Sequence, residues 1–121
     1  TDDRELQQWV ANYSRFPKDA TLSNKLKYIC DEYSLVLSLL FENQDFINNY
    51  PFEAKEFRHK LSHGNINTTY QGPIMEKLYN FSQLLLCICI LDSIEMSYQR
   101  IIKRLKANID WTRLIRGIQL N

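Results

Sequence analysis

Apolar side chains recur at helical spacing through most of the chain. Between residues 21 and 41 they follow the 3.6-residue period of one helix face, and the later leucines widen that face. The same spacing, interrupted by polar or proline-containing connectors, predicts further helices on either side. The expected helices cover residues 4–16, 21–41, 51–62, 73–97, 99–108 and 111–116, the fifth of which either continues the fourth or follows a kink.

Three local features refine these helices. Pro51 is placed in the first turn of its helix, because proline is tolerated there and disrupts a helix interior. Asp110 is expected to cap the last helix. A buried stripe on the third helix is predicted from Phe52, Phe57 and Leu61.

Glycine and proline number only three each, which favours long helices over a strand-rich fold with many turns. The fold class predicted is therefore all-α, an up-and-down bundle of four to five helices. The 121 residues suit one domain, residues 1–121, with a single core. Because the chain begins at Thr1, we expect it to be processed or taken from a longer polypeptide.

The most apolar run, residues 84–91, is eight residues long, whereas a helix needs about 20 to cross a bilayer. It is interpreted as a buried helix, and no membrane association is predicted. Three cysteines, Cys30, Cys87 and Cys89, are an odd set within apolar segments. Reduced core thiols in a cytoplasmic protein fit them better than a disulfide framework.

Charge is unevenly distributed, although the net charge is only +1. From residue 97 onward there are six cations and one anion, so this segment carries +5 and the rest of the chain −4. A basic face of this kind can hold RNA phosphates, and Lys103 and Arg104 are its candidate RNA-binding residues. The alternative is an ordinary solvated helix face.

The candidate chemistry lies in residues 58–64, Arg-His-Lys-Leu-Ser-His-Gly, at an expected helix end. Arg58 offers a forked, permanent cation that suits a phosphate, and His63 a proton that moves near neutral pH. Positions five apart lie roughly 140° around an ideal helix, so one regular helix does not aim both side chains alike. Two copies packed around a two-fold axis would bring two arginines and two histidines into one cleft.

Arg58-x4-His63, with His59 after the arginine and Gly64 after the histidine, resembles the R-x4-6-H signature of the HEPN superfamily. Members of that superfamily are small helical bundles, often dimeric, and many are metal-independent ribonucleases of toxin–antitoxin, abortive-infection and CRISPR-associated systems. The similarity in helix order covers about residues 21–106. Some relatives carry a tyrosine two residues after the histidine, where this chain has Asn65, so neutralisation through that tyrosine is not expected.

The resemblance implies RNA cleavage without a metal or cofactor. His63 of one copy would take the proton of a ribose 2′-hydroxyl, and Arg58 would stabilise charge on the phosphate oxygens, leaving a 2′,3′-cyclic phosphate. His59 and Asn65 are candidate substrate-positioning residues. The expected partners are RNA, a second copy of the chain, and a cognate antitoxin or the rest of a larger defence protein.

Three other interpretations remain open for the same residues. Cations near a helix C-terminus are favoured by the helix dipole, and glycine follows naturally, so the run is also compatible with ordinary helix termination. His59 and His63, four apart, are a common zinc pair, although Lys60 stands where the glutamate of H-E-x-x-H would be. An inactive bundle that serves dimerisation or partner binding is the third.

Overall fold

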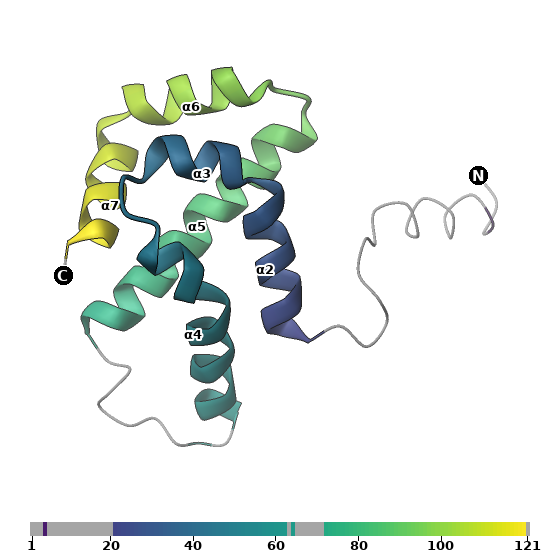
Figure 1. Ribbon diagram of the computed structural model, residues 1–121, viewed down its shortest axis with the longest axis vertical. Helices are drawn as coiled ribbons and strands as arrows, with labels where there is room; N and C mark the ends of the chain where they lie inside the picture. The colour runs from purple at the N-terminus through teal and green to yellow at the C-terminus, as the bar shows by residue number, and fades with distance from the viewer. Residues whose placement is uncertain (1–3, 5–20, 63, 65–71, 121) are drawn as a thin grey trace.

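The structure is a computed structural model that describes Arg4 and residues 21–62, 64 and 72–120 (Figure 1). Within these residues all regular structure is α-helical, which confirms the all-α class. The predicted helix at 4–16 lies outside the described residues, apart from Arg4. The described helices are α2 (Leu22–Glu32), α3 (Ser34–Leu40), α4 (Asp45–Ser62), α5 (Pro73–Ser93), α6 (Tyr98–Ala107) and α7 (Ile109–Gln119).

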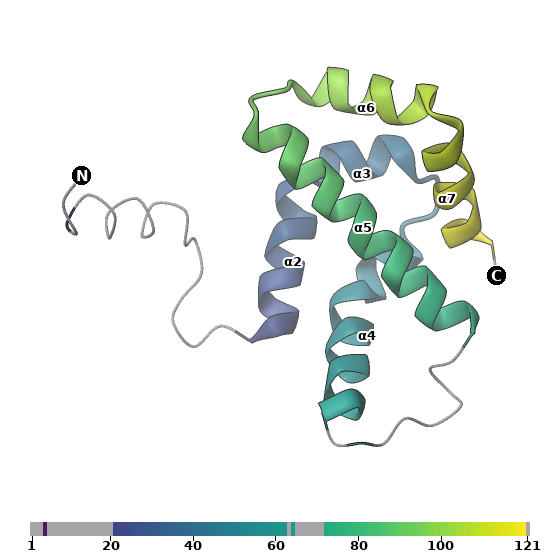
Figure 2. The same ribbon diagram turned by 180° about the vertical axis from the view of Figure 1, so that it is seen from behind.

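The helices form two layers. Figure 1 shows α2, α3 and α4 in front of α5, and Figure 2 shows α5 crossing in front of those three helices. α2 packs against α4, while α5 contacts α4, α6 and α7. α6 lies across one end of the molecule, and the C-terminal end of α4 projects at the opposite end (Figure 1).

One helix is predicted over residues 21–41, but the structure has two helices there. The prediction of a continuous helix is therefore wrong. α2 begins after Thr21, whose side-chain oxygen accepts a hydrogen bond from the Asn24 backbone N–H at 3.2 Å. The break is at Tyr33, where φ is −100° and ψ is 21°. The Tyr33 side chain is buried there and reaches Asp92 at the end of α5.

α4 begins at Asp45, six residues before the predicted start at Pro51, so the proline lies inside the helix. Proline there leaves the Ile47 carbonyl without its helical donor, a change that costs roughly 3 kcal/mol in an ordinary helix. The extra turns bury Ile47 and Tyr50, and burying a large apolar side chain contributes roughly 1.5–3 kcal/mol. The packing of this first segment therefore offsets the proline.

The C-terminal helices also differ from their predicted bounds. α5 ends at Ser93, four residues early, because the chain turns at Glu95 with a left-handed φ of 63°. Ser97, the predicted helix end, instead caps α6 and accepts from the Arg100 N–H at 3.3 Å. Asn108 caps α7, accepting from two backbone N–H groups at 2.9 and 3.0 Å, so the prediction of an Asp110 cap is wrong.

The core centres on Phe81 of α5, which is fully buried. Its ring packs edge-on against Phe41, Phe46 and Tyr50, with centroids 5.8, 5.5 and 4.6 Å away. Ser82 donates to the Leu78 carbonyl at 2.7 Å, so the Tyr50 hydroxyl must donate to Ser82 at 2.6 Å. These contacts fix the first half of α4 against α5, and the second half of α4 extends beyond them.

α5 is the described helix that is long and apolar enough to cross a bilayer, judged by length and composition alone. The eight-residue run at 84–91 is too short to span, but the helix that contains it has 21 residues. A core helix meets the same criteria, and α5 carries the fully buried Phe81, Leu84 and Ile88. A lipid-facing role of α5 would show as binding of the chain to vesicles.

Candidate functional site

Helix α4 ends immediately before the candidate histidine. Its last residue is Ser62, whose hydroxyl donates to the His59 carbonyl at 2.9 Å. Gly64 follows with a left-handed φ of 69°, and its N–H donates to the Leu61 carbonyl at 3.2 Å. A glycine in this conformation is a common helix stop, so the predicted helix end is confirmed.

Arg58 and His59 are both exposed in the last turns of α4. At about 100° per residue, Arg58 falls within about 20° of Ile47, which is buried in the core, and about 100° from its neighbour Phe57. Arg58 continues the Ile47 face beyond the end of the core. His63 and Asn65, the other two residues of the candidate site, lie outside the described residues.

The predicted buried stripe of α4 is only partly correct. Phe57 packs against the core, but Phe52 is 57% exposed and Leu61 is 46% exposed. Phe52 lies off the buried face, which passes through Ile47 and Tyr50. Leu61 lies near that face, one turn past Phe57, in the last turns of α4, which project at one end of the molecule (Figure 1).

A groove of about 410 Å³ runs between α2 and the first part of α4. Asp31 lines it together with Gln44 and Asn48, while Arg58 is ten residues further along α4, roughly 15 Å of helix. The sequence also offered Asp31, on the predicted second helix, as a residue that could orient Arg58, and this separation excludes that role. Phe52 also borders this groove, with the Lys55 ammonium 5.8 Å from its ring centroid.

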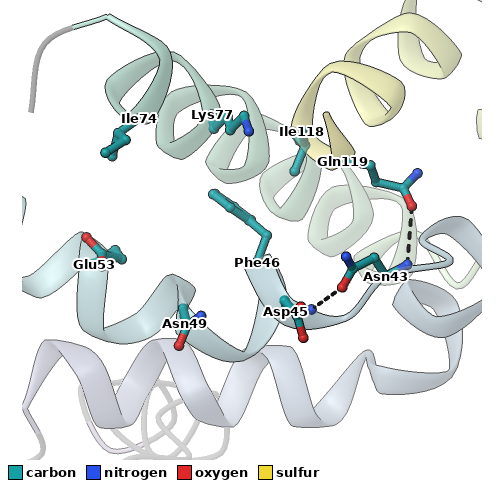
Figure 3. A pocket seen from close by; sticks show the side chains of 9 residues that line it. All are labelled: Asn43, Asp45, Phe46, Asn49, Glu53, Ile74, Lys77, Ile118 and Gln119. Carbon is teal, nitrogen blue, oxygen red and sulfur yellow. Dashed lines mark hydrogen bonds between the residues drawn. The ribbon is translucent and has the colours of Figure 1, made fainter. Parts of the chain in front are cut away.

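A second cleft, of about 320 Å³, lies where the start of α4 meets α5 and the end of α7 (Figure 3). Its polar side chains mainly serve the fold. Gln119 accepts from the Glu42 and Asn43 N–H groups at 2.9 and 3.3 Å, and Asn43 accepts from the Asp45 N–H at 2.9 Å. These hydrogen bonds connect the segment before α4 to the end of α7. The residues that line the cleft include no histidine or cysteine.

Lys103 and Arg104 are exposed on α6, as a phosphate-binding role requires. However, α6 and the C-terminal end of α4 lie at opposite ends of the molecule (Figures 1 and 2). Within one subunit, the structure does not bring these two cations together with Arg58. An RNA that contacts both regions of one copy must extend along the length of the domain.

The three cysteines are free thiols held in apolar surroundings. Burial, assisted by Asp31 and Cys89, raises the pKa of Cys30 to about 12. Burial also raises the pKa of Cys87 and of Cys89, so these thiols stay protonated at neutral pH and are poor nucleophiles. Among the described residues, no three His, Cys, Asp or Glu side chains group as a metal site would require.

Comparison with known proteins adds no relative. No protein-family profile matches the chain, and neither a curated protein nor a solved structure matches it. The functional assignment therefore rests on the residues of this chain and on their arrangement.

Proposed function

We propose that this chain is a HEPN-type bundle that acts, as a two-fold dimer, as a metal-independent endoribonuclease. The observation that carries the proposal is the position of Arg58. This exposed cation is in the last turns of a helix that projects from the core and stops one residue before His63. A phosphate of an RNA strand can reach an arginine so placed without displacing any core side chain.

Two further observations support a site shared by two copies. Leu61 is 46% exposed one turn from Arg58, so an apolar side chain is available at this helix end for contact with a second copy. α4 ends at Ser62, and Gly64 beyond it has a left-handed φ, so the helix does not continue past this end. Both features fit a cleft formed between two helix ends.

The proposed reaction is transesterification at a ribose 2′-hydroxyl. His63 of one copy accepts the 2′-hydroxyl proton, the 2′-oxygen bonds to phosphorus, and the bond from phosphorus to the 5′-oxygen breaks. His63 of the second copy, or water, protonates the leaving 5′-oxygen. Arg58 stabilises the negative charge that grows on the non-bridging oxygens. His59 and Asn65 position the substrate.

The proposed setting is antiviral defence or a toxin–antitoxin pair in the cytoplasm, with a cognate antitoxin or the remainder of a larger defence protein as partner. This setting follows from the HEPN resemblance of the Arg58-x4-His63 run. Asn65 argues against control by modification of a tyrosine at that position. Control by a binding partner that covers the site remains compatible with the sequence.

The test is cleavage of single-stranded RNA in EDTA, with chemical identification of the new ends. Cleavage that persists in EDTA and leaves 2′,3′-cyclic phosphate supports the proposal. The competing zinc interpretation predicts about one zinc ion per purified chain and a loss of stability on chelation. If the purified chain holds stoichiometric zinc and shows no EDTA-resistant cleavage, the zinc interpretation is favoured over the nuclease.

A second candidate function is that of an inactive bundle that binds a partner or dimerises. It is favoured by the large apolar side chains that α5 exposes, including Leu86 at 61% and Ile90 at 53%. Surfaces of this kind mark interaction sites in soluble proteins. A dimer that binds no RNA and cleaves none would favour this function over the nuclease.

A further inference from the structure

Helix α5 has two apolar faces on nearly opposite sides. The core face carries Leu78, Phe81 and Ile88, each no more than 5% exposed. Roughly 160° around the helix, a second stripe faces solvent. Its members are large apolar residues spaced by about one or two turns: Met75, Tyr79, Leu86, Ile90 and, at the C-terminal cap, Ile94, which are 44%, 62%, 61%, 53% and 65% exposed.

We call this second stripe the outer face of α5. Figure 2 shows α5 crossing the front of the molecule, with α2, α3 and α4 behind it. Beside the outer face lies an open groove of about 350 Å³, lined by Leu86, Ile90, Leu91 and Trp111 among others. An amphipathic surface helix normally presents polar side chains to water, so an apolar outer face indicates an absent binding partner.

The charge pattern indicates which partner fits. No charged residue occurs between Leu78 and Leu91, and the polar Gln83 donates to the Tyr79 hydroxyl at 2.8 Å on the same helix. The central part of the outer face, which has no charge, can meet its own copy without repulsion, as an interface around a two-fold axis requires. A partner chosen by charge would need complementary charges, which this central part does not offer.

The outer face is also large enough for an interface between two copies. Its five side chains leave on the order of 500 Å² exposed, at the upper end of the apolar patches that monomers carry. Stable complexes bury about 800 Å² per partner, so the outer face with its polar borders approaches one half of a standard interface. A helix of the second copy can place a side chain in the adjoining groove beside Trp111.

A bilayer is a less suitable occupant. Helices that lie on membranes carry lysines and arginines along the polar side, where they meet anionic lipids. α5 has one such residue, Lys77, and its ammonium already donates to the Leu120 carbonyl. On α5 itself, the outer face therefore lacks the flanking cations that surface binding uses.

We propose that the outer face of α5 is the surface through which two copies of this chain associate. This inference goes beyond the proposed function, because the outer face lies on the side of α5 away from α4 (Figure 2). Its support is the exposure of α5, so the interface and the nuclease can fail separately.

The experiment is light scattering on the purified chain at tens of micromolar, with two double variants. Leu86→Glu with Ile90→Glu places charge on the outer face, and we expect the mass to fall by half, to that of one chain. The matched control is Leu35→Glu with Leu39→Glu on α3, where the leucines are 57% and 51% exposed, and it should remain dimeric. Circular dichroism checks that both variants fold.

A monomeric wild-type chain would overturn the inference, as would a Leu86/Ile90 variant that stays dimeric or an equal loss of the dimer in both variants. Wild-type chain that binds vesicles of phosphatidylcholine and phosphatidylglycerol, and dissociates as it does so, would assign the outer face to lipid instead. RNA cleavage is measured in a separate assay. A wild-type dimer that cleaves no RNA refutes the nuclease and leaves this interface in place.

Discussion

The Tyr33 hydroxyl donates a 2.7 Å hydrogen bond to Oδ2 of Asp92, and this bond joins the break between α2 and α3 to the last turn of α5. Tyr33 is 6% exposed, and its ring meets Tyr98 of α6 edge-on at 5.9 Å. One side chain therefore links both layers of the fold. The core cluster around Phe81 secures the start of α4, and Tyr33 secures the other end of α5.

Replacing Tyr33 by phenylalanine should destabilise the fold. The ring packing remains, but the half-buried Asp92 carboxylate loses a donor, which costs about 1–3 kcal/mol. Urea unfolding followed by circular dichroism measures the loss. The matched control is Tyr79→Phe on the exposed side of α5, which should change stability by less than about 0.5 kcal/mol. Equal effects of the two substitutions would contradict a structural role for the Tyr33–Asp92 bond.

Stability should fall at alkaline pH because of Cys30. Its pKa is about 12 in the folded chain and 9.0 for an ordinary thiol, so above pH 9 the unfolded chain loses the proton first. The stabilisation from the protonated thiol is complete below pH 9 and declines by up to about 1.4 kcal/mol per pH unit as pH rises towards 12.

Comparison with Cys30→Ala isolates this effect. We expect wild type to lose about 1.4 kcal/mol more than the variant between pH 8 and pH 10, in urea unfolding. The window stops at pH 10 because burial also raises the pKa of Tyr33 and Tyr50, and these add a loss of the same sign above it. If the unfolding free energies of wild type and Cys30→Ala change in parallel with pH, burial does not raise the pKa of the Cys30 thiol.

Gly64 should matter through its backbone rather than its contacts. A Cβ added there meets nothing within 4 Å, but φ is +69°, and a side chain in that region costs about 1–2 kcal/mol. Gly64→Ala should therefore shift the neighbouring His63 and lower the cleavage rate. Gly64→Asn should lower it less, because asparagine tolerates the left-handed region. Rates for the two variants that fall in the reverse order would speak against this explanation.

Lys103 and Arg104 should affect RNA binding and leave the chemical step unchanged. Neutralising both, as Lys103→Gln with Arg104→Gln, removes about two phosphate contacts, so the slope of log K against log[salt] should decrease by roughly 1.4 for single-stranded RNA. Because α6 lies at the far end from Arg58, a short oligonucleotide should show a smaller change than a long one. An unchanged slope for long RNA would identify the basic segment as a solvated face.

Helices were predicted correctly from the sequence where interactions within one helix set its bounds. The predictions failed where contacts with other helices set them. The break at Tyr33 leaves no trace in the apolar spacing, because the backbone bonds from Tyr33 to Ile29 and from Leu37 to Tyr33 continue across it. The start of α4 was misplaced because a general rule about proline was weaker than the packing of Ile47 and Tyr50.

The candidate site shows the same division. The helix end at Gly64 was predictable, since glycine and the cations of the last turn act on their own helix. The exposure of Phe52 was not, because it depends on which face of α4 meets α2 and α5. Nor could the sequence indicate that Lys103 lies far from Arg58, since only the topology sets that separation.

The most direct test of the nuclease is the cleavage rate of Arg58→Ala and His63→Ala at saturating RNA in EDTA, measured beside their unfolding free energies. Loss of a general acid or base typically lowers a rate 10²–10⁴-fold. We therefore predict near-complete loss of cleavage in both variants. Stability should change by about 1 kcal/mol or less, because Arg58 is exposed near a helix end. Full activity of His63→Ala, or its unfolding, would contradict the account.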